Sequence, residues 1–455
     1  MRTAKIACCL AALAGCLALP AARAQSSARG ASSNVDAAFE AYWAADSPAE
    51  AGKRAEALVK SGVTFDDALR RLKQGRAYKP QKSGVIHLSN HTSDGIEHNF
   101  AVNVPSGYDP ARRYQVRFQL HGGVMGRSDN KERGTGEIGP LAGAEQFYVL
   151  PFSWDDQPWW SDDNILNLNQ IIDTLKRTWN VDENRIALAG VSDGATGSYY
   201  IAMRDTTPFA SFLPLNGFIM VLASGEIDDG RIFPNNLLNK PLFVVNGGRD
   251  RLYPTDDTEP FTMHLKNSGV EIDYHPQPEG EHNTKWWPEV KDSFESFVTA
   301  HPRDPHPDKL TWETADPVNN RAHWLVIDEL SADAAPETSQ AAPMPDANRI
   351  VQAENPLYIE TRGAMFRKQE ERRGRVDLVR TGNTVTASTR GVGSFTLLLS
   401  PDKFDFAQPV KVVANGREVF NGRVDRSLPT LLKWAARDND RTMLYAAELK
   451  IKVSR

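Results

Sequence analysis

Cysteine is scarce in this sequence. The chain has 455 residues, and its three cysteines, Cys8, Cys9 and Cys16, all lie near the start. The remainder has no thiol, which excludes a disulfide framework, thiol catalysis and cysteine-ligated metal sites from it. A body without disulfides must be stabilised by its hydrophobic core, and a chain of this length has enough residues for two or three domains.

Long apolar runs and an excess of positive charge are also missing. No segment reaches the length of about 20 apolar residues with which a helix crosses a membrane. Lys and Arg number 53 against 58 Asp and Glu, for a net charge of −5, so there is no electrostatic reason to expect nucleic acid as a partner. Contents of 40% hydrophobic and 24% charged residues are those of an ordinary globular protein and argue against disorder.

Residues 1–24 have the pattern of an export signal. Two basic residues precede the apolar segment 6–19, and residues 22–24 form an A-x-A cleavage site. The sequence Leu-Ala-Gly-Cys at 13–16 also resembles a lipobox, in which Cys16 becomes a lipid anchor. We therefore expect an exported protein, periplasmic or secreted, with an outer-membrane lipoprotein anchored through Cys16 as the alternative.

The segment that follows the leader predicts helices. Within residues 25–80, Phe39, Tyr42 and Trp43 share one helical face, and the sequence from 47 to 50 is typical of a helix start. These helices are expected either to cover the site as a lid or to cap the sheet described next.

Short apolar runs alternate with helical patterns between residues 81 and 302. The runs cover residues 116–120, 147–150, 186–189, 212–215 and 242–245, and the helical patterns cover 164–179, 195–203 and 255–268. Such alternation is typical of a mainly parallel sheet with helices on both faces. The sequence therefore predicts an α/β catalytic domain over residues 81–302.

Residues 303–455 predict a small all-β, sandwich-like module. Apolar runs flank two turn sequences, 381–383 and Asn415-Gly416. Asn-Gly is a strong hairpin signal because both residues tolerate positive φ. Residues 331–346 are rich in Ala, Pro and polar residues, and we interpret them as a linker-like insertion in this module.

A serine between two glycines is the candidate nucleophile. The run Gly190-Val191-Ser192-Asp193-Gly194 follows a predicted strand and precedes a predicted helix. A serine at such a sharp strand-to-helix turn projects its oxygen above the sheet, and the glycines let the backbone turn tightly. The string alone is a weak signal, but its position favours a nucleophilic serine over a serine in an ordinary tight loop.

The candidate acid and base follow in chain order. Asp250 lies just beyond one predicted strand, and His282 lies beyond the next. The order Ser192, Asp250, His282 is that of α/β-hydrolases. We expect His282 to take the serine proton and Asp250 to orient and stabilise its ring. Asp256 and Asp257 remain alternative acids.

Attack on a carbonyl group creates an oxyanion that preplaced donors must stabilise. The run His121-Gly122-Gly123 follows a predicted strand, and glycines there allow backbone N–H groups to approach a ligand. One donor is expected from Gly122, Gly123 or the neighbouring Val124, and the other from Asp193, directly after the nucleophile. His121 itself is expected to be structural.

Tryptophans lie close to these loops in the sequence. We predict that Trp159, Trp160 and Trp286 form an apolar platform that binds an acyl, aryl or sugar group of the substrate. Core packing at helix starts is the alternative for the same residues.

No metal or cofactor is expected. His87, His91 and His98 lack a matching acidic or cysteine cluster with metal-ligand spacing. His275 falls inside a predicted strand and is interpreted as a packed or edge residue rather than as the base.

These motifs resemble those of secreted α/β-hydrolases related to prolyl oligopeptidases, polyhydroxyalkanoate depolymerases and feruloyl esterases. The resemblance covers roughly residues 85–300 and rests on His121-Gly122-Gly123, Gly190-Val191-Ser192-Asp193-Gly194, Gly247-Gly248-Arg249-Asp250 and Gly280-Glu281-His282. It implies an esterase or peptidase with a Ser-Asp-His triad and no cofactor. The chain departs from prolyl oligopeptidases in having no long N-terminal β-propeller, and from many secreted depolymerases in lacking disulfide cysteines.

The sequence thus predicts an exported, cofactor-free serine hydrolase that acts on a small-molecule or polymer substrate, with an ester favoured over an amide. A serine peptidase of the prolyl-oligopeptidase type is the first alternative. The second is a non-catalytic protein that binds a polymer or glycan on a hydrolase scaffold, since a fold alone does not guarantee activity. An inert scaffold, however, has no physical need for Ser192, Asp250 and His282 together.

Overall fold

The computed structural model describes residues 33–93, 95–129, 136–224, 226–331 and 373–453. The expected leader 1–24, with Cys16, lies outside the described residues. So does the predicted linker 331–346, apart from its first residue.

An eight-stranded sheet forms the centre of the α/β part. Its strand order is β1-β2-β4-β3-β5-β6-β7-β8. The strands are β1 (Gly84–His91), β2 (Glu97–Val104), β3 (Tyr114–Leu120), β4 (Phe147–Pro151), β5 (Val181–Val191), β6 (Ser211–Leu215), β7 (Leu242–Gly247) and β8 (Ile272–Gln277). Strands β4, β3, β5, β6, β7 and β8 run parallel, and β1 and β2 are antiparallel additions at one edge. The predicted, mainly parallel sheet is confirmed.

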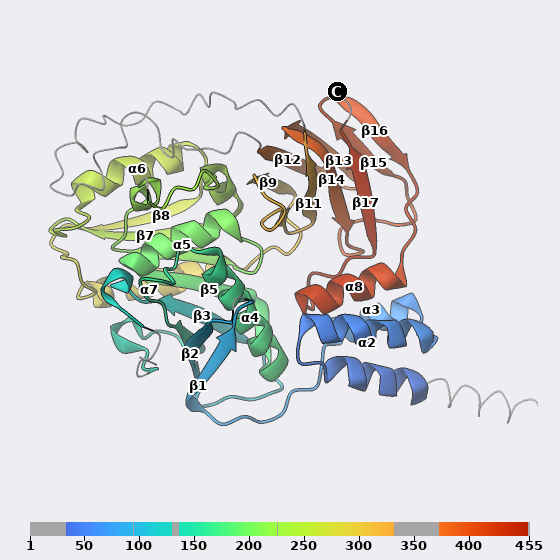
Figure 1. Cartoon of the computed structure of the whole chain (residues 1–455), viewed down its shortest axis with the longest axis horizontal. Coiled ribbons are helices and arrows are strands. Elements are labelled where there is room, and N and C mark those ends of the chain that lie inside the picture. Colours follow the sequence, from blue (N-terminus) through green and yellow to red (C-terminus); the bar gives the residue numbers. More distant parts are fainter. Residues whose placement is uncertain (1–32, 94, 130–135, 225, 332–372, 454–455) are drawn as a thin grey trace, which may run out of the picture.

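Helices cover both faces of this sheet (Figure 1). They are α4 (Asp162–Thr178), α5 (Asp193–Arg204), α6 (Thr255–Asn267) and α7 (Trp287–Ala300). Within β5, Leu188 packs in the core formed with α4, α5 and α6, whereas its neighbour Ala187 faces α7 and packs with Phe294. Because both faces are covered, β6 and β7 are buried along their whole length, which explains why their sequences are continuous apolar runs.

The C-terminal part contains two further sheets, as a sandwich requires. One has the order β10-β11-β14-β17 and the other β16-β15-β13-β12-β9. Their strands are β9 (Lys309–Thr314), β10 (Arg321–Ala322), β11 (Leu325–Leu330), β12 (Gly374–Thr381), β13 (Thr384–Arg390), β14 (Val392–Leu399), β15 (Val410–Ala414), β16 (Arg417–Gly422) and β17 (Ala447–Lys452). Trp312, Phe395 and Val412, all buried, belong to the core that these sheets share. The predicted hairpin turn is present, with φ of 48° at Asn415 and 78° at Gly416.

The C-terminal module is not all-β, because it includes helix α8 (Leu428–Asp438). Ser427 caps this helix by accepting a hydrogen bond from the Thr430 N–H, and Pro429 occupies its first turn. Its apolar face, including Leu431 and Leu432, is buried. The sequence interpretation missed α8 because its apolar residues serve a core whose other members lie at the opposite end of the chain.

The N-terminal helices supply that core. Helices α2 (Pro48–Lys60) and α3 (Phe65–Gln74) contact α8, and a helix over residues 33–43 lies on the other side of α2 (Figure 1). Leu58 of α2 and Leu431 of α8 are members of one buried cluster. These helices therefore join the C-terminal module to the start of the described chain, instead of capping the central sheet as one expectation held.

Buried ion pairs connect the C-terminal module to the α/β part. Asp440 accepts hydrogen bonds from Lys176 Nζ of α4 at 3.2 Å and from Arg303 Nη2 at 2.8 Å, and Arg303 also donates through Nε to Asn184 of β5 at 3.1 Å. Burial alone would raise the pKa of Asp440, but the two cations hold this pKa well below its usual range. Arg441 pairs in turn with Glu183, with 2.9 Å between Nη2 and Oε2. Breaking such buried pairs is costly, so the two parts are firmly attached.

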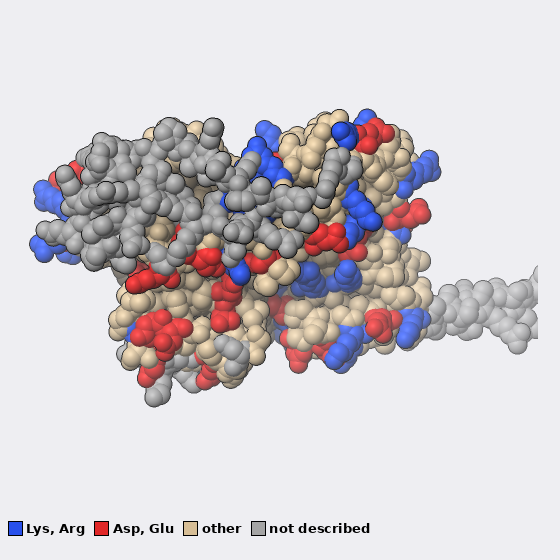
Figure 2. Space-filling model, turned by 45° about the horizontal axis from the view of Figure 1, so that its top comes forward, with Lys and Arg blue, Asp and Glu red and all other residues tan. Residues whose placement is uncertain are grey.

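The surface carries mixed charges. On the described part of the face in Figure 2, Asp and Glu side chains are interspersed with Lys and Arg, and no extended basic patch is visible there. Among the described helices, none is both long and apolar enough to cross a membrane.

A cavity-creating substitution tests the shared helical core. Leu58→Ala removes a fully buried side chain and should lower the free energy of unfolding by about 2–5 kcal/mol. The adjacent Val59, which is 40% exposed, offers a matched control. Val59→Ala should change the free energy of unfolding by less than about 1 kcal/mol. Chemical denaturation followed by tryptophan fluorescence measures both, and equal effects would contradict this packing.

Candidate active site

Ser192 occupies the sharp turn between β5 and α5. Its backbone has φ 58° and ψ −118°, a conformation that few residues other than glycine adopt. The turn is fixed from a neighbouring strand, because the Ser192 N–H donates to the Leu215 carbonyl oxygen at 3.0 Å. Strained positive-φ residues of this kind persist only where the surrounding structure holds them.

The two glycines that flank Ser192 are required by close backbone contacts. A Cβ at Gly190 would lie 1.9 Å from the Gly194 carbonyl oxygen, and a Cβ at Gly194 would lie 2.2 Å from the Leu120 carbonyl oxygen. Both distances are too short for any side chain. Glycine at 190 therefore allows β5 to approach α5, and glycine at 194 allows α5 to approach β3.

Asp250 lies in the loop that leaves the carboxyl end of β7. Its side chain is fully buried. Oδ1 accepts hydrogen bonds from the backbone N–H groups of Leu252 at 2.8 Å and Tyr253 at 3.0 Å. Oδ2 is 2.7 Å from Nδ1 of His282. Every oxygen of this carboxylate thus has a partner, and its orientation toward the histidine is fixed.

His282 lies in the loop after β8, and this loop is hydrogen-bonded to the loop that carries Asp250. The Arg249 N–H donates to the Gly280 carbonyl oxygen at 2.8 Å, and the Gly248 N–H donates to the Gln277 carbonyl oxygen at 2.7 Å. Nε2 of His282 is 2.9 Å from Oγ of Ser192. The histidine ring therefore bridges serine and aspartate, although 90 residues separate it from the serine.

The electrostatics of the site favour an ionised Asp250. Burial raises the pKa of this carboxyl group, but the hydrogen bond from His282 and those from the Tyr253 and Leu252 N–H groups outweigh it, so the pKa is lowered below its ordinary value. An ionised Asp250 accepts from Nδ1–H, which leaves Nε2 as the acceptor facing the serine hydroxyl. This is the tautomer that a general base requires.

The backbone donors beside Ser192 are partly occupied. The Val124 N–H donates to Oδ2 of Asp193 at 2.7 Å and is therefore not available to an oxyanion. Asp193 is the first residue of α5, so its own N–H has no acceptor within the helix. A Cβ at Gly122 would lie only 2.9 Å from Cβ of Ser192, so the Gly122-Gly123 backbone adjoins the serine. The donors left open are those of Asp193 and of Gly122 or Gly123.

His121 holds this loop in place. Its Nδ1 is 2.9 Å from the Gly122 carbonyl oxygen, and its Nε2 accepts from the Ser153 N–H at 3.1 Å. Burial lowers the pKa of His121 to about 4, so the ring is neutral at neutral pH and can accept at Nε2. These contacts agree with the structural part expected of His121.

The chain has only distant similarity to known proteins. The sequence matches no protein-family model. Over 171 residues it is 24% identical to a probable feruloyl esterase C of Aspergillus terreus, a match that covers 35% of this chain and 62% of that protein. The chain thus spans about three fifths of the length of the curated relative it matches.

Solved structures similar to the chain include two esterases. A thermostable esterase aligns over 48% of this chain and 63% of its own, with 21% identity and a TM-score of 0.38. A ferulic acid esterase of Anaeromyces mucronatus aligns over 50% of this chain and 94% of its own, with 16% identity and a TM-score of 0.36. Both alignments span about half of this chain. At these identities we argue the chemistry of the site from its own geometry.

Two of the three predicted substrate-binding tryptophans are in the core. Trp159 is completely buried, and its Nε1 donates to the His121 carbonyl oxygen at 2.8 Å. Trp286 is 4% exposed and packs against the ring of Trp287 beneath α7. The expectation that they form a substrate platform is therefore corrected, because both side chains are enclosed by the hydrophobic core and offer almost no surface to a ligand. Trp160 is partly exposed and remains a candidate.

The alternative acids and the alternative histidine lie in regular elements of the fold. Asp256 and Asp257 lie in the first turn of α6, whereas Asp250 contacts His282 directly. The ring of His275 stacks on Phe243, with centroids 4.4 Å apart, as a packed strand residue does.

Two supporting residues were missed in the sequence. Asn216, directly after β6, has φ 48°, and its Nδ2 donates to the Asn283 carbonyl oxygen at 2.7 Å, which anchors the histidine loop. The ring of Tyr253 lies 5.6 Å from that of His282. Asn216 could have been recognised from the sequence, because an Asn-Gly pair directly after an apolar strand indicates a turn and asparagine tolerates positive φ. Nothing local marks Tyr253.

Removing the Asp250 charge should make stability less dependent on pH. Because the pKa of Asp250 is lowered on folding, the ionised carboxylate stabilises the protein at pH values above the pKa of an unfolded aspartate, about 3.9. This stabilisation is lost as the pH falls through the pKa of Asp250 in the folded protein. Asp250→Asn should therefore lower the free energy of unfolding by about 1.5–3 kcal/mol at pH 7, and this difference from wild type should shrink below pH 4.

Denaturant unfolding at pH 7, 5 and 3.5 measures the difference. Asp256→Asn, a change at an exposed position of α6, is the matched control and should have a smaller effect. A wild-type advantage that stays constant down to pH 3.5 would contradict the inferred ionisation of Asp250.

Proposed function

We propose that the protein is an exported serine hydrolase that cleaves a carboxylic ester through an acyl-enzyme intermediate. The observation that carries the proposal is the continuous chain of contacts from Ser192 Oγ through His282 to Asp250, with distances of 2.9 and 2.7 Å. A hydroxyl, an oriented imidazole and a buried carboxylate in this order make up the machinery of acyl transfer.

The first half-reaction forms the acyl-enzyme. Ser192 Oγ attacks the ester carbonyl carbon while Nε2 of His282 takes the hydroxyl proton. The imidazolium that results is stabilised by Asp250 and returns the proton to the departing alkoxide as the ester C–O bond breaks. In the second half-reaction, water attacks the acyl group, and His282 takes a proton from the water and gives it back to Ser192. No cofactor enters the balance.

Charge on the carbonyl oxygen requires donors that are in place before attack. The N–H of Asp193 at the start of α5, together with that of Gly122 or Gly123, is suited to this purpose. The carboxylate of Asp193 holds the glycine loop through Val124 and so keeps the two donors at a fixed separation. Helix α5 adds a favourable dipole at the same position.

An ester of a phenolic acid is the first substrate class to test. The curated relative with 24% identity is named a probable feruloyl esterase. A serine peptidase of the prolyl-oligopeptidase type remains the alternative, because the triad fixes the nucleophile and not the leaving group. Export is supported by the leader pattern in residues 1–24, with lipidation of Cys16 as the variant of this proposal.

Fluorophosphonate labelling tests the nucleophile. Wild type should form one covalent adduct on Ser192, located by mass spectrometry, and Ser192→Ala should form none and lose ester hydrolysis by a factor on the order of 10⁶. Ser268→Ala, which changes an exposed serine at the end of α6, is the matched control and should label like wild type. A folded wild type without an adduct at Ser192 would refute the proposal.

Matched substrates decide between ester and amide. A methyl ester and an anilide of the same hydroxycinnamic acid present the same acyl group, so the ratio of their kcat/KM values reports the leaving group alone. We expect the ester to be hydrolysed at least tenfold faster after correction for its higher intrinsic reactivity. A corrected preference for the anilide would support the peptidase alternative.

A further inference from the structure

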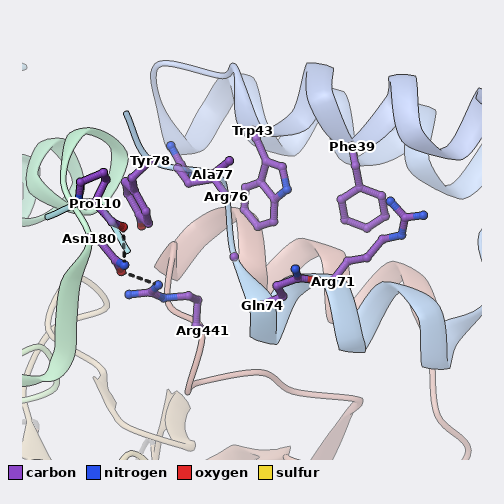
Figure 3. Close-up of a pocket in the computed structure, with 11 residues that line it drawn as sticks. Phe39, Trp43, Arg71, Gln74, Arg76, Ala77, Tyr78, Pro110, Asn180 and Arg441 are labelled. Carbon is purple, nitrogen blue, oxygen red and sulfur yellow. Dashed lines mark hydrogen bonds between the residues drawn. The ribbon is translucent and has the colours of Figure 1, made fainter. Parts of the chain in front are cut away.

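A pocket lies where three parts of the chain meet, and no residue of the triad lines it (Figure 3). Its volume is about 350 Å³, at the lower end of the range for small-ligand sites. One wall comes from the N-terminal helix of residues 33–43, another from the end of α3 and the segment after it, and the rest from Pro110 and Asn180 of the α/β part and Arg441 of the C-terminal module.

Arginines paired with aromatic rings form the walls. The guanidinium carbon lies 5.2 Å from the ring centre in the Arg71–Phe39 pair, 5.3 Å in the Arg76–Trp43 pair and 5.7 Å in the Arg441–Tyr78 pair. Cation–π contacts of this kind hold a guanidinium while leaving its N–H edge free to bind an acceptor. The pocket therefore offers flat apolar surfaces and cationic donors side by side.

Two of the three arginines are already neutralised. Arg71 contacts Asp36 at 2.7 Å and Asp67 at 3.0 Å. Arg441 pairs with Glu183 through two nitrogens. Their charges are balanced within the protein, so neither needs an anionic ligand.

Arg76 differs because its hydrogen-bond partners are neutral. Nη2 donates to Oδ1 of Asn439 at 2.9 Å, and Nη1 donates weakly to the Arg177 carbonyl oxygen at 3.5 Å. Within the described part of the chain, no carboxylate lies at ion-pair distance from it. The nearby Asp173 is engaged by Arg177, with 2.6 Å between Oδ2 and Nε.

The surroundings of Arg76 make its charge costly. Burial lowers the pKa of Arg76, and the neighbouring Arg177 cation lowers it further, against the opposite influence of Tyr78 and Asp173. The guanidinium stays charged at neutral pH, since arginine does not lose its proton in proteins. An anion entering the pocket would relieve this imbalance.

We propose that this pocket binds a small monocarboxylate built on a single ring, with the carboxylate on Arg76 and the ring against Trp43. Arginine binds carboxylates through two parallel hydrogen bonds, and a ring of this size fits the volume. Hydroxycinnamic acids and uronic acids share this chemistry. The site is separate from Ser192, and the proposal does not depend on the proposed function.

Isothermal titration calorimetry on the Ser192→Ala protein tests the site without substrate turnover. The probes are 4-hydroxycinnamate and glucuronate, each with a neutral counterpart, 4-hydroxycinnamamide and glucose. We expect at least one carboxylate to bind with one-to-one stoichiometry and its neutral counterpart to bind at least tenfold more weakly. The tighter carboxylate identifies the aromatic or the sugar acid as the ligand class.

Variants locate the binding. Arg76→Gln in the same background should raise Kd at least tenfold, and Arg76→Lys should retain part of the affinity because it keeps the cation. Arg426→Gln is the matched control, since Arg426 also stacks on an aromatic ring, Phe65, and is paired with Asp66, but does not line the pocket. It should leave Kd unchanged.

Several outcomes would overturn the proposal. The proposal is wrong if neither carboxylate binds at millimolar concentration. It is also wrong if the neutral counterparts bind as tightly as the carboxylates. An unchanged Kd in Arg76→Gln would place the ligand elsewhere, for example at residue 192. Should Arg76→Gln not fold, Trp43→Leu takes its place and should weaken binding severalfold, and an unchanged Kd there would overturn the proposal as well.

Discussion

The sharp turn at Ser192 is the constraint on which the rest of the site depends. A non-glycine residue at φ 58° costs about 1–3 kcal/mol and is kept by its surroundings. Here they are the hydrogen bond from the Ser192 N–H to Leu215 and the contact of β5 with α5, which Gly190 and Gly194 allow. The turn lifts the hydroxyl above the carboxyl edge of the sheet, where it meets groups from other strands.

The parallel sheet then determines which groups these are. Strands β5, β6, β7 and β8 lie side by side in the order of the chain, so their carboxyl ends form one edge. The loops after β7 and β8 are tied to each other by backbone hydrogen bonds, and Asn216 ties the histidine loop to the end of β6. Serine, histidine and aspartate are held by the same rigid framework, which suits a reaction that tolerates little displacement.

The two ends of the described chain are united in a second structural unit. The N-terminal helices and α8 share a core, and the C-terminal sandwich is attached to the α/β part by buried pairs such as Asp440 with Arg303 and Lys176. A junction of three chain segments leaves a pocket, and the uncompensated charge of Arg76 sets this pocket apart from a packing defect. The α/β part thus adjoins a pocket whose lining comes mostly from the N-terminal helices and the segment after them.

The sequence by itself determined what depends on local pattern. Strands β3 to β7, the hairpin at Asn415-Gly416 and the Gly-flanked Ser192 follow from apolar runs and turn chemistry within a few residues. The order Ser192, Asp250, His282 named the groups that lie within hydrogen-bond distance of one another. Only the tertiary structure decided that Trp159 and Trp286 are buried, that Asp193 occupies the Val124 N–H and that α8 packs on the N-terminal helices. These three features depend on contacts between residues that are far apart in the sequence. Such contacts leave no periodic pattern in the segments that make them.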